Sequence, residues 1–159
     1  MKMDELKKLF VMSGIKNIST YIQSGNVVFD SPETDTAVLQ EKIEKKLFKA
    51  LGYEVTVFLR TFDEVRNIIK QNPFEKEMEE MGLYVSMLSA VPDAEGLKAL
   101  QLLIGEQEQV KVLGTAAYIL CIKNGYGNSK LSNVSLEKKM KVKSTTRNWA
   151  TMNKILALE

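Results

Sequence analysis

Histidine is absent from this sequence of 159 residues, and that absence excludes more chemistry than any other feature of the composition. Ser-His-Asp and Cys-His nucleophiles both need an imidazole, and transition-metal sites usually need histidine or several cysteines. The single cysteine, Cys121, lies in an apolar run, which is typical of a small buried hydrophobic residue. We therefore predict no catalytic residue, no metal and no cofactor. An enzyme of this sequence would have to work with Asp, Glu, Lys, Tyr or backbone groups.

Long hydrophobic runs and disulfide pairs are also missing. The longest apolar run, residues 116–122, is far too short to span a bilayer. The first ten residues are amphipathic and carry acids, unlike a secretory signal, and one cysteine cannot form an internal disulfide. With 45% hydrophobic and 26% charged residues, the composition predicts a soluble globular protein of the reducing cytoplasm, without a membrane partner.

Negative charge is scarce in the last quarter of the chain. Residues 123–159 hold eight basic residues and two acids, a net charge of +6, whereas residues 1–122 carry a net charge of −4. Such an asymmetry can mark a surface that faces anions, and it can equally be a solvated helix face.

The first half of the chain alternates between helical and strand patterns. Apolar residues recur at helical spacing in some segments and alternate in others. Ser31-Pro32 has the form of a helix start, and a helix avoids the residue before Pro73. The predicted elements are a helix over 3–13, strands over 17–22 and 26–30, a helix from Ser31-Pro32 to Gly52, a strand over 53–59 and a helix that starts at Thr61 and ends before Asn72.

The second half repeats this kind of alternation after an acidic connection. The predicted elements are a strand over 83–90, a helix capped by Asp93, strands over 109–113 and 116–122, a helix near 132–140 and a terminal helix capped by Thr145 or Thr146. In that terminal helix we expect Trp149 and Met152 to face the core.

Together the two halves predict an α+β fold of tandem ferredoxin-like (α-β plait) units with mainly antiparallel sheets. The second half runs β-α-β-β-α, and the first runs α-β-β-α-β, so the first unit lacks the usual first strand of this architecture. The predicted boundaries are 1–72 for the first unit, 73–82 for the connection and 83–159 for the second unit with its C-terminal helix. The gap would expose sheet edges, and three outcomes are open: a shortened chain, a strand donated by a partner chain, or a shift of residues near Met1 or of the segment 53–60 that closes the sheet. We expect a shortened chain that compensates by self-association as a homo-oligomer.

Five motifs in order over nearly the whole chain carry a family resemblance. They are "KMDELKKLF" at 2–10, "TYIQSGNVVF" at 20–29, "NPF" at 72–74, "SKL" at 129–131 and "TTRNW" at 145–149. With them the chain resembles the bacterial family called domain of unknown function 1697. The resemblance implies tandem α-β plaits and supplies no chemistry. Family members usually begin with a strand and a glycine-containing loop ahead of the segment matching Met3, and this chain lacks both.

Two segments of the basic region are candidates for binding an anion. The loop in residues 124–133 joins a strand to a helix, where backbone N–H groups can hold phosphate, although the Walker A spacing is missing. Residues 143–149 would begin a helix, where Arg147 offers a bidentate fork. Ordinary capping explains both segments as well. The predicted anion-binding residues are Gly125, Gly127, Asn128, Ser129, Lys130, Thr145, Thr146, Arg147 and Asn148.

A third candidate is the polar centre of "YIQSGNVVF". Gly25-Asn26 suits a two-residue hairpin turn, because glycine accepts the positive φ that such a turn needs. A turn is therefore a sufficient reason for these residues, and a binding role for Gln23, Ser24 and Asn26 is the second reading.

Three hypotheses of function remain open on the sequence. The first is a non-catalytic protein that binds an anionic small molecule, such as a nucleotide, or nucleic acid through its basic C-terminal half. The second is a self-associating structural protein whose basic segment is merely solvated. The third is a small enzyme without histidine or metal, such as a transferase. The RNP aromatic consensus of RNA-binding plaits is absent, which weakens the RNA version of the first hypothesis.

Overall fold

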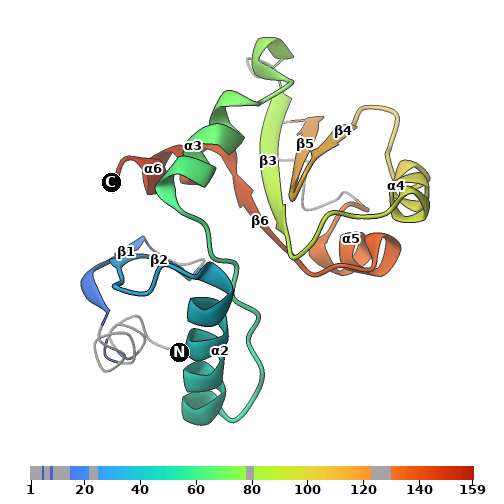
Figure 1. The fold of residues 1–159 in the computed structure, drawn as a ribbon. Coiled ribbons are helices and arrows are strands. Elements are labelled where there is room, and N and C mark those ends of the chain that lie inside the picture. The colour runs from blue at the N-terminus through green and yellow to red at the C-terminus, as the bar shows by residue number, and fades with distance from the viewer. Residues whose placement is uncertain (1–4, 6–7, 9–14, 22–24, 78–80, 123–129) are drawn as a thin grey trace. The chain divides into compact units, whose positions relative to one another are not determined.

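The chain forms two compact units that combine helices with antiparallel sheets (Figure 1). The computed structural model describes residues 5, 8, 15–21, 25–77, 81–122 and 130–159. Unit 1 comprises Met1–Phe62 and Lys154–Glu159, and unit 2 comprises Asp63–Asn153. The predicted α+β class with antiparallel sheets is therefore confirmed, but the chain divides before residue 63 rather than in the predicted connection at 73–82.

Unit 1 is built on a hairpin and one long helix. Strands β1 (Lys16–Tyr21) and β2 (Asn26–Asp30) pair antiparallel, and helix α2 (Thr36–Leu51) follows them. One face of α2 is apolar at helical spacing and packs on residues around the hairpin. The buried residues of this core are Ile15, Ile18, Leu39, Ile43 and Leu47.

Two predictions in unit 1 need correction, one about a hairpin turn and one about a helix cap. Asn26 pairs with Tyr21 as the first residue of β2, so the predicted two-residue Gly25-Asn26 turn is wrong. Gly25 does have the positive φ that was expected, +72°. Helix α2 is capped by Asp35, whose carboxylate accepts hydrogen bonds from the amides of Ala37 and Val38, and not by Ser31. Of the predicted helix over 3–13, only residues 5 and 8 are described, and both are helical.

The predicted strand over 53–59 is wrong. Residues 54–61 have no regular secondary structure, although Val55, Val57 and Leu59 pack against the core of unit 1 with strand-like alternation. The amide of Val57 donates to the Glu44 carboxylate of α2 at 3.0 Å. A strand is defined by pairing with another strand, and the described residues supply no strand partner for this segment.

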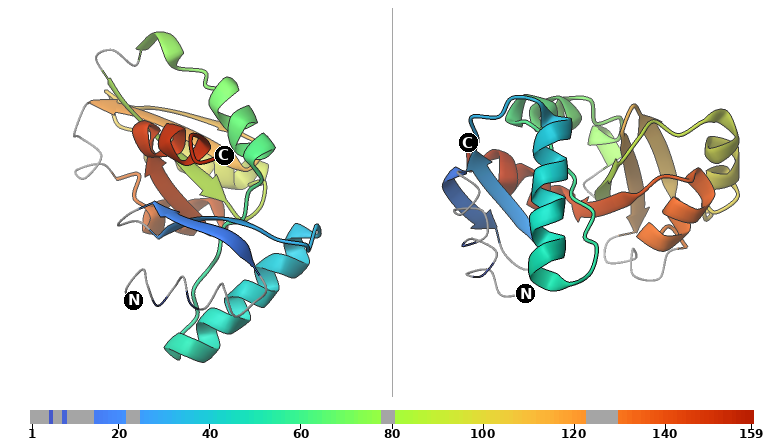
Figure 2. Two further views of the ribbon diagram at one scale, coloured as in Figure 1. Left: turned by 90° about the vertical axis from the view of Figure 1, so that its left-hand side faces the viewer. Right: turned by 60° about the horizontal axis from the view of Figure 1, so that its bottom comes forward.

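Unit 2 contains a four-stranded antiparallel sheet in the order β4-β5-β3-β6. Helices α4 and α5 cover one face of the sheet, and α3 with the first turns of α6 covers the other (Figures 1 and 2). The elements are α3 (Phe62–Lys70), η1 (Glu75–Glu77), β3 (Met81–Leu88), α4 (Ala94–Gln101), β4 (Gln109–Leu113), β5 (Ala116–Ile122), α5 (Asn133–Met140), β6 (Ser144–Asn148) and α6 (Trp149–Leu156).

Helices α4 and α5 cover an apolar core of unit 2. It buries Leu88, Leu100, Ala117, Ile119, Leu131, Leu136 and Met140. Gly96 lets the two helices approach closely, because a Cβ at this position would lie 3.1 Å from the Met140 Cα. The Asp93 carboxylate caps α4 as predicted, accepting a hydrogen bond from the Gly96 amide at 2.7 Å.

The predicted terminal helix from Thr145 or Thr146 is wrong in its first part. Ser144–Asn148 forms strand β6 against β3, and helix α6 begins only at Trp149. The Asn148 side-chain oxygen accepts a hydrogen bond from the Thr151 amide at 2.8 Å, which is the geometry of an N-cap. Met152 is buried, as expected, but Trp149 is only half-buried.

Replacing this cap gives a first testable expectation. Asn148→Ala should lower the free energy of unfolding by about 1 kcal/mol, because the amide of Thr151 loses its acceptor. Asn148→Asp is the matched control, since its carboxylate can cap and favours the positive end of the helix dipole. Urea denaturation of the three proteins measures the difference, and an unchanged midpoint for Asn148→Ala would contradict the assigned helix start.

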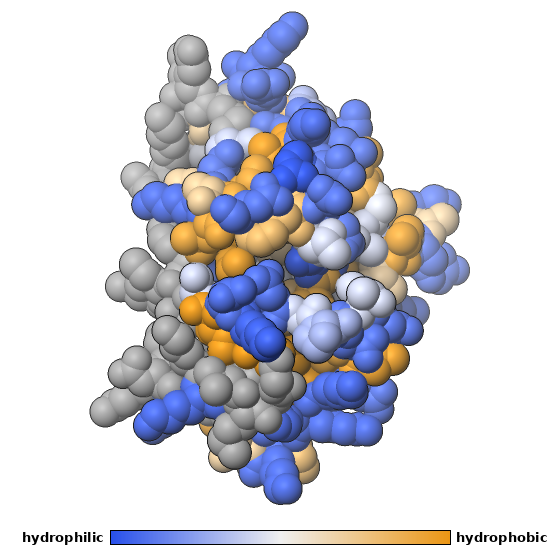
Figure 3. All heavy atoms as spheres, turned by 60° about the vertical axis from the view of Figure 1, so that its left-hand side comes forward, coloured by the Kyte–Doolittle hydropathy of each residue, from blue (hydrophilic) through white to orange (hydrophobic). Residues whose placement is uncertain are grey.

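Several large hydrophobic side chains reach the surface, and some are visible among hydrophilic ones on the face in Figure 3. They come from α2, α4, α5 and from loops, and singly exposed hydrophobic residues are normal in soluble proteins. The exposed residues are Val38, Phe48, Tyr53, Val91, Leu97, Leu102, Val134 and Leu158. No helix of the described ranges is both long and apolar enough to cross a membrane.

Candidate functional site

Strand β6 divides the residues that the sequence grouped as one anion site. Arg147 lies opposite Val85 of β3, and Thr146 lies opposite Ser86. Because successive side chains of a strand point to opposite faces, Thr145 shares the face of Arg147 and Thr146 lies on the other face. Helix α6 begins only after these residues, at Trp149, and Asn148 is its N-cap, so Thr145 and Thr146 do not cap a helix as predicted.

Arg147 is held against its own strand. Its Nη1 donates to the Thr145 hydroxyl at 2.8 Å and to the Thr146 carbonyl at 2.9 Å. Burial lowers the pKa of the Arg147 guanidinium, although an arginine keeps its charge at neutral pH. A ligand that bound this guanidinium would therefore have to compete with bonds that the strand already provides.

Thr146 belongs to a polar cluster that positions helix α5. The Thr146 hydroxyl donates to the side-chain oxygen of Asn133 at 2.6 Å, and the Ser144 hydroxyl donates to the same atom at 3.2 Å. Asn133 is the first residue of α5, and Ser132 caps that helix by accepting from the Ser135 amide. These two hydroxyls thus fix the start of α5 against strand β6.

The other predicted site residues lie apart from this strand or outside the described ranges. Lys130 is exposed just ahead of α5. Asn26 begins strand β2 in unit 1. Outside the described residues lie Gln23, Ser24, Gly125, Gly127, Asn128 and Ser129. Their predicted roles stay predictions.

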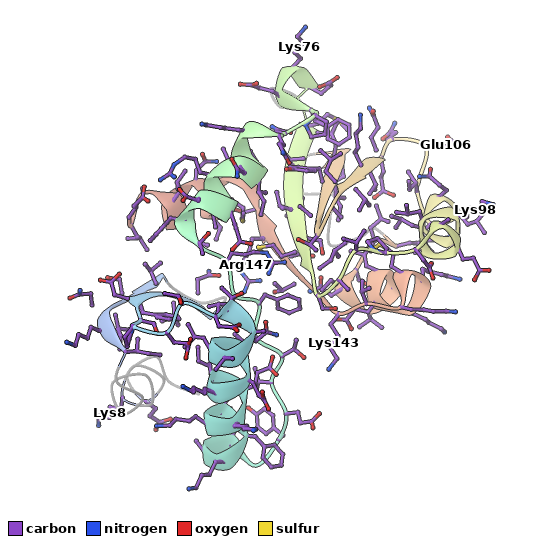
Figure 4. All side chains as sticks on the ribbon, viewed as in Figure 1. Lys8, Lys76, Lys98, Glu106, Lys143 and Arg147 are labelled. Carbon is purple, nitrogen blue, oxygen red and sulfur yellow. The ribbon has the colours of Figure 1, made fainter. Side chains whose placement is uncertain are left out.

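A dense group of lysines begins in the last turn of α5 and continues beyond it, and no sequence motif singled it out. We call it the α5 lysine cluster: Lys138, Lys139, Lys141 and Lys143. All four side chains are exposed, and Figure 4 shows Lys143 projecting outward ahead of β6. The nearest acid in sequence, Glu137, already accepts a hydrogen bond from the Ser144 amide at 2.8 Å. The spacing of four lysines within six residues was the signal that could have revealed it.

The Cys121 thiol and the Ser86 hydroxyl are buried, and Tyr84 is half-buried. Burial raises the pKa of the Cys121 thiol, with a smaller contribution from Glu108, so the thiol is not activated. Burial also raises the pKa of Tyr84. The Ser86 hydroxyl is buried and has no hydrogen-bond partner among the described atoms, hence no base to activate it. Within the described ranges, no group of acids and cysteine could hold a metal ion.

The comparisons with known proteins agree with this fold. Residues 1–118 match the family described as Protein of unknown function (DUF1697). The chain belongs to this family. A solved structure, the conserved bacterial protein SP0830 from Streptococcus pneumoniae, is similar to this DUF1697 chain with a TM-score of 0.75 and 15% identity, over 99% of this chain and 88% of that one. At that identity the likeness shows the fold alone. Among curated proteins, none matches the sequence.

Proposed function

We propose that this DUF1697 protein is a non-catalytic binding protein of the bacterial cytoplasm that takes an anionic ligand, a nucleic acid or a nucleotide. Unit 2 would carry the contact surface, in a complete ferredoxin-like arrangement of β3-α4-β4-β5-α5-β6. The observation that carries the proposal is the α5 lysine cluster, four exposed lysines in six residues. It replaces the predicted grouping of Lys130 with Arg147 as the centre of the surface.

The four lysines concentrate positive charge within six residues. Four like charges so close together repel one another, and an anion that bound them would relieve that repulsion. The negative end of the dipole of α5 stabilises lysines in its last turn by only a modest free energy. Lysines that neutralise phosphates release the counterions condensed on the nucleic acid, so binding of nucleic acid should depend steeply on salt.

Binding to single-stranded and duplex nucleic acid as a function of salt tests this proposal. Replacing the α5 lysine cluster by glutamine should flatten the slope of log Kobs against log[salt] by about 3, since each neutralised phosphate contributes about 0.7–0.9. The variant should keep its fold, because all four side chains are exposed.

Helix α2 provides a matched control with the same change of charge. Its four exposed lysines, Lys42, Lys45, Lys46 and Lys49, lie among acids, and ion pairs join Lys42 to Glu33 and Lys45 to Glu41. Their replacement by glutamine should leave most of the salt slope in place. If both variants lose the same amount of salt slope, the effect comes from net charge and not from the α5 lysine cluster. A wild type that binds neither heparin nor nucleic acid at low salt would refute the proposal.

A second candidate is self-association as a structural protein. One observation favours it: the strand-like segment 53–60 packs on the core of unit 1 and has no strand partner among the described residues. Backbone edges of this kind pair readily with another chain. Of the three initial hypotheses, the small enzyme has no such observation in its favour.

A further inference from the structure

We infer that Lys141 contacts the phosphodiester backbone of a nucleic acid, and that this contact is the reason for a lysine at a backbone conformation that favours glycine. The inference rests on the proposed function, anion binding by the α5 lysine cluster. It adds the ligand class and one residue that makes the contact.

Lys141 ends helix α5 in the left-handed backbone conformation, with φ 56° and ψ 35°. This conformation brings the Cβ of an L-residue close to the following carbonyl oxygen, so glycine is the usual residue there. Helix α2 follows that rule, since its C-cap is Gly52. Apart from glycines, the only other described residue with a positive φ is Asn17, and asparagine tolerates this region because its short side chain can hydrogen-bond locally. A lysine lacks that compensation, so residue 141 gives up stability that a glycine would supply.

The dipole of α5 offers a competing, structural reason for this lysine, because the negative end of the dipole lies at the C-cap. Lys138 and Lys139 already place two positive charges in the last turn of the helix. A third lysine at the C-cap gains little more, since the effect of the dipole falls off within that turn and like charges close together repel one another. The dipole therefore does not account for the choice of lysine at residue 141.

The backbone on both sides of Lys141 is fixed to unit 2. Met140 is buried against α4, where a Cβ at Gly96 would lie 3.1 Å from the Met140 Cα. The Ser89 amide donates to the Lys143 carbonyl at 2.8 Å, and the Lys143 amide donates to the Ser89 hydroxyl at 2.9 Å. The exposed Lys141 side chain thus starts from a fixed point of the backbone, so less conformational freedom is lost when a phosphate binds it.

The exposure of the cluster selects a polymer as the ligand. Lys138, Lys139 and Lys141 form no ion pair with any residue that the structure describes. A small nucleotide is normally held in a concave pocket that buries most of its surface, whereas exposed lysines at a helix end suit a chain of phosphates. The cluster therefore favours a nucleic acid over a free nucleotide.

Urea denaturation and the binding of a short DNA duplex at several salt concentrations test the role of Lys141. Lys141→Gly should raise the urea midpoint, because glycine adopts the left-handed conformation without strain. The same variant should flatten the slope of log Kobs against log[salt] by about 0.9, the contribution of one phosphate contact, and weaken binding about eightfold at about 0.1 M salt. Lys141→Arg keeps the charge and the strain, so it should keep the midpoint and the slope of the wild type.

Lys98→Gln is the control for the loss of one charge. Lys98 is exposed on α4, and Figure 4 shows it well separated from Lys143 within unit 2. Its replacement should leave the salt slope of the wild type in place.

A Lys141→Gly protein that is more stable and binds more weakly, with Lys98→Gln unchanged, supports the inference, because a lysine with only a structural role would not alter the salt slope. A Lys141→Gly protein that keeps the slope, loses no more of it than Lys98→Gln, or is less stable than the wild type overturns the inference, and anion binding then rests on the other lysines of the cluster. A wild type that binds ATP as tightly as the duplex overturns the assigned ligand class and leaves anion binding in place. A wild type that binds neither refutes the proposed function together with this inference.

Discussion

Met152→Ala is expected to lower the free energy of unfolding by about 2–5 kcal/mol, the range for truncating a buried methionine. Met152 is 1% exposed, whereas Trp149, one turn earlier on α6, is half-buried. Truncating the larger tryptophan should therefore cost less than its size suggests, because part of its surface already contacts water. Chemical denaturation at equilibrium measures both changes.

The two variants distinguish a terminal helix that begins at Trp149, as in the structure, from one that begins at Thr145 or Thr146, as the sequence predicts. If the terminal helix began at Thr145 or Thr146, Trp149 would lie on its apolar face and Trp149→Ala would be the costlier change. Asn153→Ala on the exposed side of α6 is the control and should cost about 0.5 kcal/mol or less. A larger loss for Trp149→Ala than for Met152→Ala would contradict the assigned burial.

Elements with local signals could be predicted from the sequence. Strands β4 and β5 have the predicted bounds at 109–113 and nearly those at 116–122, because Gly114 with φ +60° makes the turn between them. Asp93 and Ser132 mark the starts of α4 and α5 through their own hydrogen bonds. Each of these signals acts within a few residues, so no knowledge of distant neighbours was needed.

Elements that depend on distant partners were mispredicted. The two threonines before Arg147 are good helix caps and good strand residues, and pairing with β3, far away in the sequence, decides for the strand. The reverse holds for residues 53–60, where the pattern favours a strand and the described residues offer no strand to pair with. Propensity alone could not settle either case.

The predicted helix start at Thr145 or Thr146 was wrong for the same reason. A helix start at 145–148 would gather Thr146 and Arg147 around one end, whereas a strand separates them onto two faces. The α5 lysine cluster was present in the charge count, but exposure identifies it as a surface. The Glu44 carboxylate that accepts from the Val57 amide has no local signal, since 13 residues separate the two groups.

Tyr118 joins the sheet of unit 2 to helix α3 through one buried hydrogen bond. Its hydroxyl donates to the Ile68 carbonyl in the last turn of α3. That carbonyl needs an outside donor, because the Asn72 amide bonds to Ile69 instead. Tyr118→Phe should therefore cost about 1–3 kcal/mol at neutral pH, since the variant leaves a buried acceptor unsatisfied.

The same residue should make the wild type sensitive to alkali. Burial raises the pKa of Tyr118 from 10.0 to about 12, so the folded state holds its proton at a pH where the unfolded chain releases it. Stability from this group is thus complete below about pH 10 and falls by about 2–3 kcal/mol as the pH rises to about 12. Tyr118→Phe should remove most of that fall, and Tyr84→Phe, whose pKa is raised in the same direction, should remove a smaller part. Denaturation midpoints at pH 8 to 12 for the three proteins give the comparison. An equally steep alkaline loss in Tyr118→Phe would show that this phenol does not control it.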